Sequence, residues 1–277
     1  MIKDIVVQMD ATQAASRRLD LALCLAERSE AHVVGLYVDS FEQMLMYSDI
    51  YAVASLMEVV AEEAARDAAA SRARFDQAVA GRAITTEWRE VKGLTDRKIA
   101  EHGRYADLIV LGQNDPGDPT TGSAARVPEQ VPLSSGKPCL IVPYKPCPPS
   151  FGENVLVCWD GSREASRAVS DALPLLRAAK QVTVAQIKAV TGDPFAGGLD
   201  LAAFSTHLAR HGIALQVRSE AAEGRSVAQA LLSMVAGLSA DLMVMGAYGH
   251  TRLRELVLGG VTREILAHMT VPVLMSH

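Results

Sequence analysis

The sequence predicts an α/β protein of two tandem doubly wound domains, each an open, mostly parallel sheet with helices on both faces. Two observations lead to this prediction. The chain contains an internal repeat, and each repeat alternates short β-branched runs with amphipathic stretches of helical spacing. A length of 277 residues, near twice the commonest domain size, agrees with two domains.

The repeat is visible at the start and near the end of each half. KDIVVQMDATQAASR at 3–17 aligns with ENVLVCWDGSREASR at 153–167 at a constant offset of 150. ADLIVLG at 106–112 aligns with ADLMVMG at 240–246 at an offset of 134. Because the offset falls from 150 to 134, the first half carries 16 additional residues in its middle.

The join between the halves lies near PYKPCPPSFGEN, residues 143–154. Prolines and a glycine interrupt any helix or central strand there, which is typical of a linker. We therefore expect an N-terminal domain over residues 1–145 and a C-terminal domain over residues 152–277.

Apolar runs predict the strands, and helical spacing predicts the covering helices. Runs such as DIVVQM, AHVVGLYV, ADLIVLG and CLIVP are apolar on both faces, as in parallel strands covered from both sides. Helical spacing of apolar residues appears in three stretches, with residues 19, 22, 23 and 26, residues 165, 169, 172 and 176, and residues 227, 231, 234 and 238.

Two features of the sequence predict the length or the shape of particular helices. The alanine- and glutamate-rich stretch 41–79 contains the additional residues of the first half and predicts a long helix before the third strand. Pro174 predicts a kink or an early end to its helix, because proline removes a hydrogen bond and crowds the carbonyl four residues back.

The composition argues against several classes of partner. A net charge of −5 and a pI near 5.8 do not suit a surface that neutralises nucleic acid. No run approaches the roughly 18 apolar residues that span a bilayer, and Lys3 and Asp4 lie in the first nine residues. We expect a cytoplasmic protein that neither binds nucleic acid nor inserts into membranes.

Cysteine and histidine spacing does not predict a metal site. The four cysteines form no CxxC motif and read as reduced thiols. His207 and His211 have the i, i+4 spacing of metal ligands but no nearby third ligand, so an exposed helical face is the preferred interpretation.

A glycine-rich segment follows an apolar run near the end of the second half. MGAYGHTRLRELVLGGVT, residues 245–262, contains four glycines and precedes a predicted helix. Ligands of open parallel sheets bind beyond the carboxyl ends of the strands, a rule that selects this segment together with Cys158, Trp159, Asp160 and Ile187. Glycines let the free N–H groups at a helix start approach anionic oxygens. The segment therefore predicts a phosphate-binding loop.

With this loop in view, the sequence resembles the universal stress protein family, in a tandem arrangement. The family's nucleotide pattern, G-x2-G-x9-G-(S/T), is met by Gly246, Gly249 and Gly259, with Gly260 in the place of the usual hydroxyl residue. The resemblance implies an adenine nucleotide alpha hydrolase-like fold with five strands in each sheet. It also implies bound ATP, or AMP or ADP, with Mg²⁺ as an optional bridging ion, in the C-terminal domain.

The resemblance further implies a regulatory binding protein of the stress response. Its protein client is unidentified, and association would run through the final strands, with residues 139–142 and 271–275 as candidate edges. The two halves could pair within one chain as a pseudo-dimer, or the chain could form a homodimer.

The resemblance also assigns roles to residues of the second half. Asp160 would hold the ribose hydroxyls or the adenine edge, and the backbone of Ile187 would contact adenine. The missing hydroxyl at Gly260 removes one phosphate ligand, although the amide remains. The other expected binding residues lie at the end of the apolar run ADLMVM and along the loop that follows it. They are Met245, Gly246, Gly249, His250, Arg252, Gly259, Val261 and Thr262.

Several of these residues have a second interpretation. Asp160 could be the N-cap of the following helix, and the glycines could serve turns that need positive φ. Arg252 and Arg254 could be solvated surface charges.

The first half has lost the glycine pattern. Only Gly112 is kept, and Asp115, Ala125 and Arg126 stand at the other three positions. Asp115 would repel phosphate, and Pro132 conflicts with a regular helix after the loop. We expect that the first domain does not hold ATP in the same way, although Arg126 could bind another ligand.

The motifs of phosphoryl or acyl transfer are missing from the sequence, which contains neither GxxxxGK[ST] nor GxSxG. A nucleotide-responsive binding protein is therefore the preferred interpretation. A slow ATP-hydrolysing enzyme and a ligand-free interaction scaffold stay open as alternatives.

Overall fold

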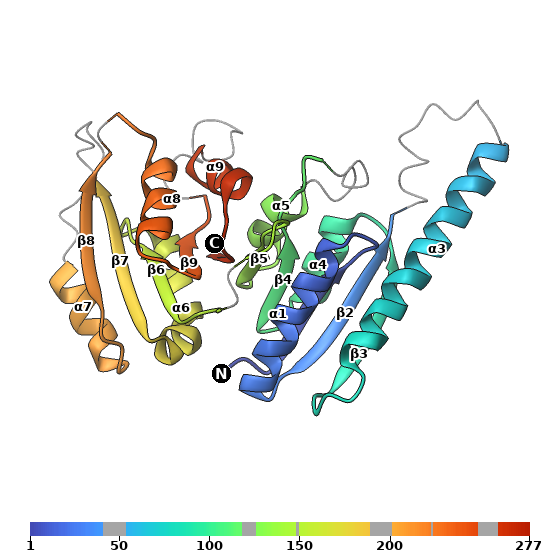
Figure 1. The fold of residues 1–277 in the computed structure, drawn as a ribbon, viewed down its shortest axis with the longest axis horizontal. Coiled ribbons are helices and arrows are strands. Elements are labelled where there is room, and N and C mark those ends of the chain that lie inside the picture. Colours follow the sequence, from blue (N-terminus) through green and yellow to red (C-terminus); the bar gives the residue numbers. More distant parts are fainter. Residues whose placement is uncertain (41–53, 118–125, 148–149, 189–200, 223, 249–259) are drawn as a thin grey trace. The chain divides into compact units, whose positions relative to one another are not determined.

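The computed structural model describes residues 1–40, 54–117, 126–147, 150–188, 201–222, 224–248 and 260–277 (Figure 1). The contacts between residues divide the chain into two compact units, Met1–Tyr144 and Lys145–His277. Each unit is an α/β domain around a parallel sheet, which confirms the predicted fold class.

The first unit orders its strands β3-β2-β1-β4-β5, all parallel. The order along the sheet reverses between β1 and β4, which pair with Ile5 opposite Leu108. The elements of this unit are β1 (Asp4–Met9), α1 (Ala14–Ser29), β2 (His32–Asp39), α3 (Ala54–Val79), β3 (Thr86–Lys92), α4 (Thr95–Gly103), β4 (Leu108–Gly112), α5 (Val127–Ser134) and β5 (Cys139–Val142).

The second unit repeats this arrangement with the order β10-β9-β6-β7-β8, again all parallel. Its reversal lies between β6 and β9, where Val155 is opposite Leu242. The elements are β6 (Asn154–Cys158), α6 (Arg163–Ala178), β7 (Gln181–Lys188), α7 (Leu201–Arg210), β8 (Gln216–Ala221), α8 (Val227–Gly237), β9 (Leu242–Gly246), α9 (Gly260–His268) and β10 (Val273–Ser276).

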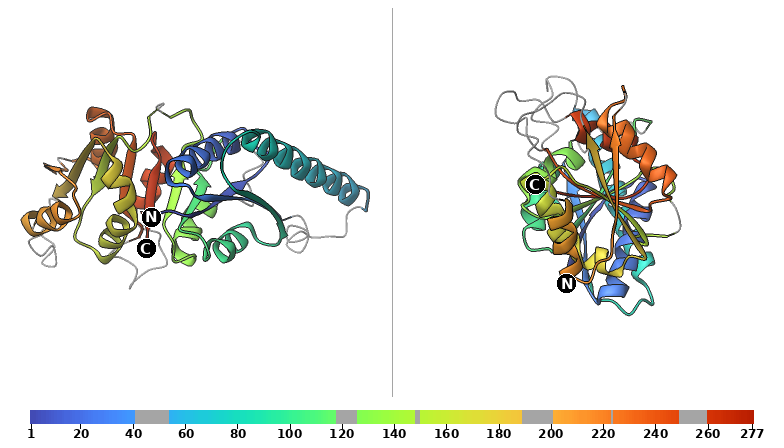
Figure 2. Two further views of the ribbon diagram at one scale, coloured as in Figure 1. Left: turned by 90° about the horizontal axis from the view of Figure 1, so that it is seen from below. Right: turned by 90° about the vertical axis from the view of Figure 1, so that its left-hand side faces the viewer.

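Helices cover both faces of each sheet. In the first unit α1 and α3 lie on one face and α4 and α5 on the other, and α6 with α7 and α8 with α9 repeat this division in the second unit (Figure 2). The strands next to each reversal are buried, as their apolar sequences predict: β4 is buried along its whole length. Right-handed crossovers in opposite directions produce this layering.

The prediction that Pro132 prevents a regular helix is wrong, because α5 contains this residue. Helix α6 continues through Pro174 to Ala178, so the helix does not end early there, and the kink stays a prediction. Each proline deprives one carbonyl, four residues earlier, of its helical partner, and packing of the apolar face against the sheet offsets this loss. The predicted long helix before the third strand is present as α3 over Ala54–Val79, and residues 41–53 lie outside the described part.

A buried carboxylate holds the start of the first strand of the second unit. Asp241, 1% exposed, precedes β9 and accepts the N–H groups of Glu153 at 3.1 Å and Asn154 at 2.9 Å. Its counterpart in the repeat, Asp107, accepts the N–H groups of Lys3 and Asp4 at 2.7 and 3.2 Å but is exposed. The same pair of hydrogen bonds therefore connects neighbouring strands in both units, but the carboxylate is buried in the second unit and exposed in the first.

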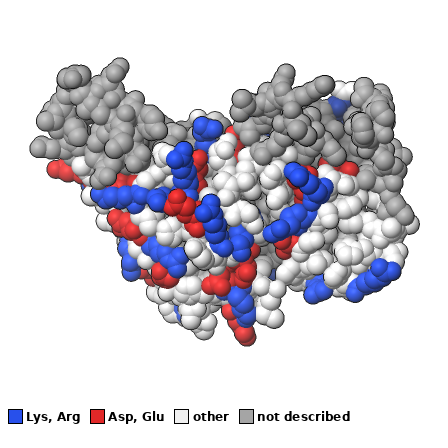
Figure 3. Space-filling model, turned by 180° about the vertical axis from the view of Figure 1, so that it is seen from behind, with Lys and Arg blue, Asp and Glu red and all other residues white. Residues whose placement is uncertain are grey.

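The surface carries both signs of charge. On the face drawn in Figure 3, basic and acidic side chains are interspersed over the described residues rather than gathered by sign. Within the described ranges, no helix combines the length and apolar character needed to cross a membrane.

We predict that Asp241→Ala destabilises the second unit by about 2 kcal/mol, because two partly buried N–H groups lose their acceptor. Asp107→Ala removes the same two hydrogen bonds at an exposed position, where water replaces them, and should cost about 1 kcal/mol or less. Urea unfolding followed by circular dichroism measures both free energies. Equal losses for the two variants would contradict the role given to burial.

Candidate functional site

A pocket of about 380 Å³ opens in the second unit at the carboxyl edge of its sheet, beside the reversal between β6 and β9. This is where an open parallel sheet binds its ligands. Residues from three strand ends and from the starts of α8 and α9 line it: Cys158, Trp159, Asp160, Ala185, Ile187, Val227, Leu231, Met245, Gly246, Tyr248, Gly260, Val261 and Thr262.

Seven of the predicted binding residues line this pocket. They come from segments up to about a hundred residues apart in sequence, and they are Asp160, Ile187, Met245, Gly246, Gly260, Val261 and Thr262. The remaining predicted residues, Gly249, His250, Arg252 and Gly259, fall in 249–259, outside the described residues, as does Arg254.

One wall of the pocket is apolar. Ile187 at the end of β7 and Met245 at the end of β9 meet Val227 and Leu231 of α8 there. Sequence reasoning assigned Val227 and Leu231 only to helix packing, because their spacing fits a buried helical face equally well. The wall provides a surface suited to a flat apolar group.

Trp159 lines the pocket next to Asp160, at the strand end that the sequence rule selected, although sequence reasoning gave it no binding role. Its backbone N–H donates to Ala185 O at 2.9 Å, and its ring stacks on Phe204 of α7 with centroids 3.9 Å apart and planes 19° apart. The stack fixes the indole ring at the pocket edge.

Asp160 orders the turn that leads into α6. Its Oδ1 accepts the N–H of Ser162 at 2.9 Å, and Gly161 between them has φ +74°. The N-cap of α6 is Ser162, whose side chain accepts the N–H of Ala165 at 3.1 Å. The alternative prediction that Asp160 is the N-cap is therefore wrong. Asp160 is exposed, and its Oδ2 has no protein donor among the described residues.

The start of α9 forms the other side of the pocket. The helix spans Gly260–His268, so it starts earlier than predicted from the segment REILAHM, and its first N–H groups have no partner within the helix. Thr262 Oγ1 accepts the N–H of Tyr248 at 3.3 Å, and both residues are buried. Tyr248 has φ +58°, which turns the chain after β9 toward this helix. The Thr262 hydroxyl thus joins the two sides of the glycine-rich segment.

Two glycines of this site have different reasons to be glycine. A Cβ on Gly246 would lie 2.5 Å from Ala165 N and 2.7 Å from Glu164 C, so the absence of a side chain lets the first turn of α6 pack on β9. A Cβ on Gly260 would meet no atom of the described residues within 4 Å. Packing therefore explains Gly246, and Gly260 borders open space at the pocket.

Among the described residues, the titratable groups near the pocket do not form an activated nucleophile or a metal site. Burial, followed by the charge of Asp160, raises the pKa of the Cys158 thiol to about 12, so the thiol is protonated at neutral pH. No group of three or more metal-ligating side chains occurs within the described ranges. Arg177 Nη2 lies 3.0 Å from His211 Nδ1, and the ring of His207 is 4.8 Å from that of His211.

The sequence profile of the Universal stress protein family matches residues 1–143 and again residues 152–277. The chain belongs to the universal stress protein family. Both matches lie in the repeats found by sequence alone, so this member carries two family domains in tandem.

One universal stress protein shares part of the sequence, and two solved structures share the fold over nearly the whole chain. Universal stress protein Slr1230 of Synechocystis sp. is 28% identical over 172 residues, 61% of this chain. That match spans about 57% of the length of the Synechocystis protein. The universal stress protein structure from Archaeoglobus fulgidus has a TM-score of 0.70 at 18% identity, covering 99% of this chain and 97% of that one. The functionally unknown protein PA1789 of Pseudomonas aeruginosa PAO1 has a TM-score of 0.60 at 17% identity, covering 99% and 92%.

We predict that Gly246→Ala destabilises the second unit by about 1–3 kcal/mol, because the new Cβ overlaps backbone atoms of α6 that cannot move without shifting the helix. Gly260→Ala serves as the matched control. It places the same methyl group in open space at a helix start and should be neutral or slightly stabilising. Thermal unfolding of both variants decides the point, and a Gly246→Ala protein as stable as the wild type would contradict the packing role.

Proposed function

We propose that this protein is an adenine-nucleotide-binding regulator of the stress response, with ATP, AMP or ADP held in the pocket of the second unit. One observation carries the proposal. At the strand-order reversal, a pocket of about 380 Å³ combines an apolar wall, an exposed carboxylate and a helix start that borders open space. Its volume lies within the range of small-molecule sites, toward the lower end.

Each side of the pocket suits one part of a nucleotide. The wall formed by Ile187, Val227 and Leu231 would cover the base. Asp160 Oδ2 would accept hydrogen bonds from ribose hydroxyls, because its Oδ1 is already used by the turn. The free N–H groups at the start of α9 would face the phosphates, where both the donors and the helix dipole favour negative charge.

The glycine-rich loop would complete the site. By their sequence positions, Gly249, His250, Arg252 and Gly259 are the residues we propose around the phosphates, with Mg²⁺ as an optional ion bound mainly to phosphate oxygens. A nucleotide that contacts this loop biases its conformation, and a client protein would read that difference. We further propose a cytoplasmic location, since adenine nucleotides are abundant there. Pairing through residues 139–142 and 271–275 stays a prediction.

We predict that the wild-type protein retains labelled ATP in equilibrium dialysis and that Asp160→Ala binds it about tenfold more weakly. The loss corresponds to about 1.4 kcal/mol, the size of one charge-assisted hydrogen bond. Asp171→Ala is the matched control, because it removes a carboxylate of the same unit that pairs with Arg167 on the surface of α6. If the wild-type protein retains no ATP, with and without Mg²⁺, the proposed function is wrong.

We also predict an optical signal of binding. The chain has two tryptophans, so Trp88→Phe leaves Trp159 at the pocket edge as the one reporter. Addition of ATP should change its emission, because a ligand in the pocket displaces water from the indole. The converse variant, Trp159→Phe, keeps Trp88 in the first unit and should show no change. If ATP changes the tryptophan emission of neither variant but is retained in dialysis, ATP binds at a site away from Trp159.

A further inference from the structure

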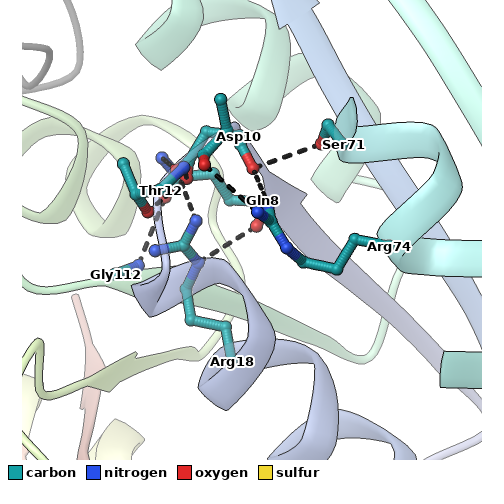
Figure 4. A network of polar contacts seen from close by, with 8 residues as sticks. Gln8, Asp10, Thr12, Arg18, Ser71, Arg74 and Gly112 are labelled. Carbon is teal, nitrogen blue, oxygen red and sulfur yellow. Dashed lines mark hydrogen bonds and ion pairs between the residues drawn. The ribbon is translucent and has the colours of Figure 1, made fainter. Parts of the chain in front are cut away.

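A buried arginine lies at the strand-order reversal of the first unit (Figure 4). Arg18 projects from α1, is 3% exposed, and donates from Nε to Gln8 O at 3.1 Å. Its Nη2 donates to Asp10 Oδ2 and forms an ion pair with it. Gly112 at the end of β4 packs against the guanidinium so closely that a Cβ there would overlap Nη1. The guanidinium therefore lies between the carboxyl ends of β1 and β4.

Asp10 is surrounded by donors from its own domain. Its Oδ1 accepts the N–H of Thr12 at 3.0 Å and also the Thr12 hydroxyl, and its Oδ2 accepts Gln8 Nε2 at 3.4 Å besides Arg18. From α3, Arg74 Nη1 donates to Asp10 O at 2.9 Å, and Ser71 Oγ lies 3.3 Å from the same carbonyl. Both carboxylate oxygens are therefore occupied without any ligand.

Gln8 joins the two strands directly. Its Oε1 accepts the N–H of Gly112 at 3.2 Å, and the side chain is 5% exposed. The ends of β1 and β4 are thus joined by this hydrogen bond, and the guanidinium of Arg18, bonded to Gln8 O, packs against Gly112 beside it.

The second unit has different residues at the same places in the repeat. At the offset of 150, Ala168 replaces Arg18 and Cys158 replaces Gln8, whereas Asp160 keeps the acidic residue of Asp10. Among the described residues, Asp160 accepts one hydrogen bond, from Ser162, and the strand-order reversal beside it opens into the pocket. At this place in the repeat the first unit therefore has a long cationic side chain, and the second unit has a methyl group.

We propose that Arg18 is a built-in substitute for a ligand in the first unit. Its guanidinium fills the crevice at the strand-order reversal and neutralises Asp10, so that this domain keeps its crevice closed without nucleotide. The unit is then a structural half, and the chain binds one nucleotide, in the second unit. The stoichiometry of one nucleotide per chain rests on the proposed function, whereas the role of Arg18 within the first unit does not.

The test removes the guanidinium group of Arg18 by mutation and then adds a small guanidinium compound to the solution. Arg18→Ala leaves Asp10 partly buried without its partner and should lower the unfolding midpoint of the first unit by about 5–10 °C. Millimolar ethylguanidinium should raise that midpoint again, because it fits the vacated place beside Asp10, whereas ethylammonium should not, since it lacks the planar fork of donors. Arg82→Ala, which removes a surface ion pair with Glu27, is the matched control and should show no rescue.

The double variant Asp10→Asn/Arg18→Ala tests the pairing. It has no carboxylate to hold the added cation, so ethylguanidinium should leave its midpoint unchanged. A single Arg18→Ala variant that is as stable as the wild type, or one that both cations affect equally, overturns the proposal.

If Arg18→Ala does not fold, the wild-type protein supplies the measurement. With nitrogen-15 labelling, the Nε–H of Arg18 should exchange with solvent at least tenfold more slowly than that of exposed Arg163, because it is buried and bonded to Gln8 O. Equal exchange rates would overturn the proposal.

Counting bound ATP separates the two proposals. One nucleotide per chain supports both, and two per chain contradict a filled first unit. No bound nucleotide defeats the proposed function, and the rescue by ethylguanidinium then still decides the role of Arg18.

Discussion

The reversal of strand order in a parallel sheet is the constraint on which both halves of this protein depend. The chain leaves β6 toward α6 on one face of the sheet and leaves β9 toward α9 on the other. Because these two connections leave toward opposite faces, no connection covers the carboxyl ends of the two neighbouring strands, and a crevice forms between those ends. The backbone creates this crevice whatever the side chains are, so each domain must either fill it or leave it open to a ligand.

The two domains meet this requirement differently while keeping the same fold. In the first, Gln8 hydrogen-bonds Gly112 across the ends of β1 and β4, Arg18 bonds Gln8 O and Asp10 and packs on Gly112, and Asp10 accepts hydrogen bonds on both oxygens. In the second, small residues at the matching positions leave a pocket beside Asp160. Carboxylates at equivalent positions thus have different surroundings, because one neighbouring side chain differs in length and charge.

The glycines show how far a motif can be interpreted from sequence. The spacing of Gly246, Gly249 and Gly259 suggested one role for all of them, close approach to phosphate. The structure gives Gly246 a packing role against α6, whereas Gly260 borders the open pocket. The pattern therefore combines a constraint from the fold with a possible constraint from the ligand, and spacing alone does not separate the two.

Sequence by itself determined the tandem repeat, the alternation of strands and helices, and the edge of the sheet where Asp160, Ile187 and Gly260 meet. Periodicity and repetition are local properties of the chain, so they can be read without coordinates. Only the tertiary structure showed that Trp159 stacks on Phe204, that Ser162 caps α6, and that the buried Arg18 pairs with Asp10. These contacts depend on how helices and strands pack in three dimensions and on the rotamers of the side chains. Local sequence patterns do not specify either, so they do not predict which side chains come into contact.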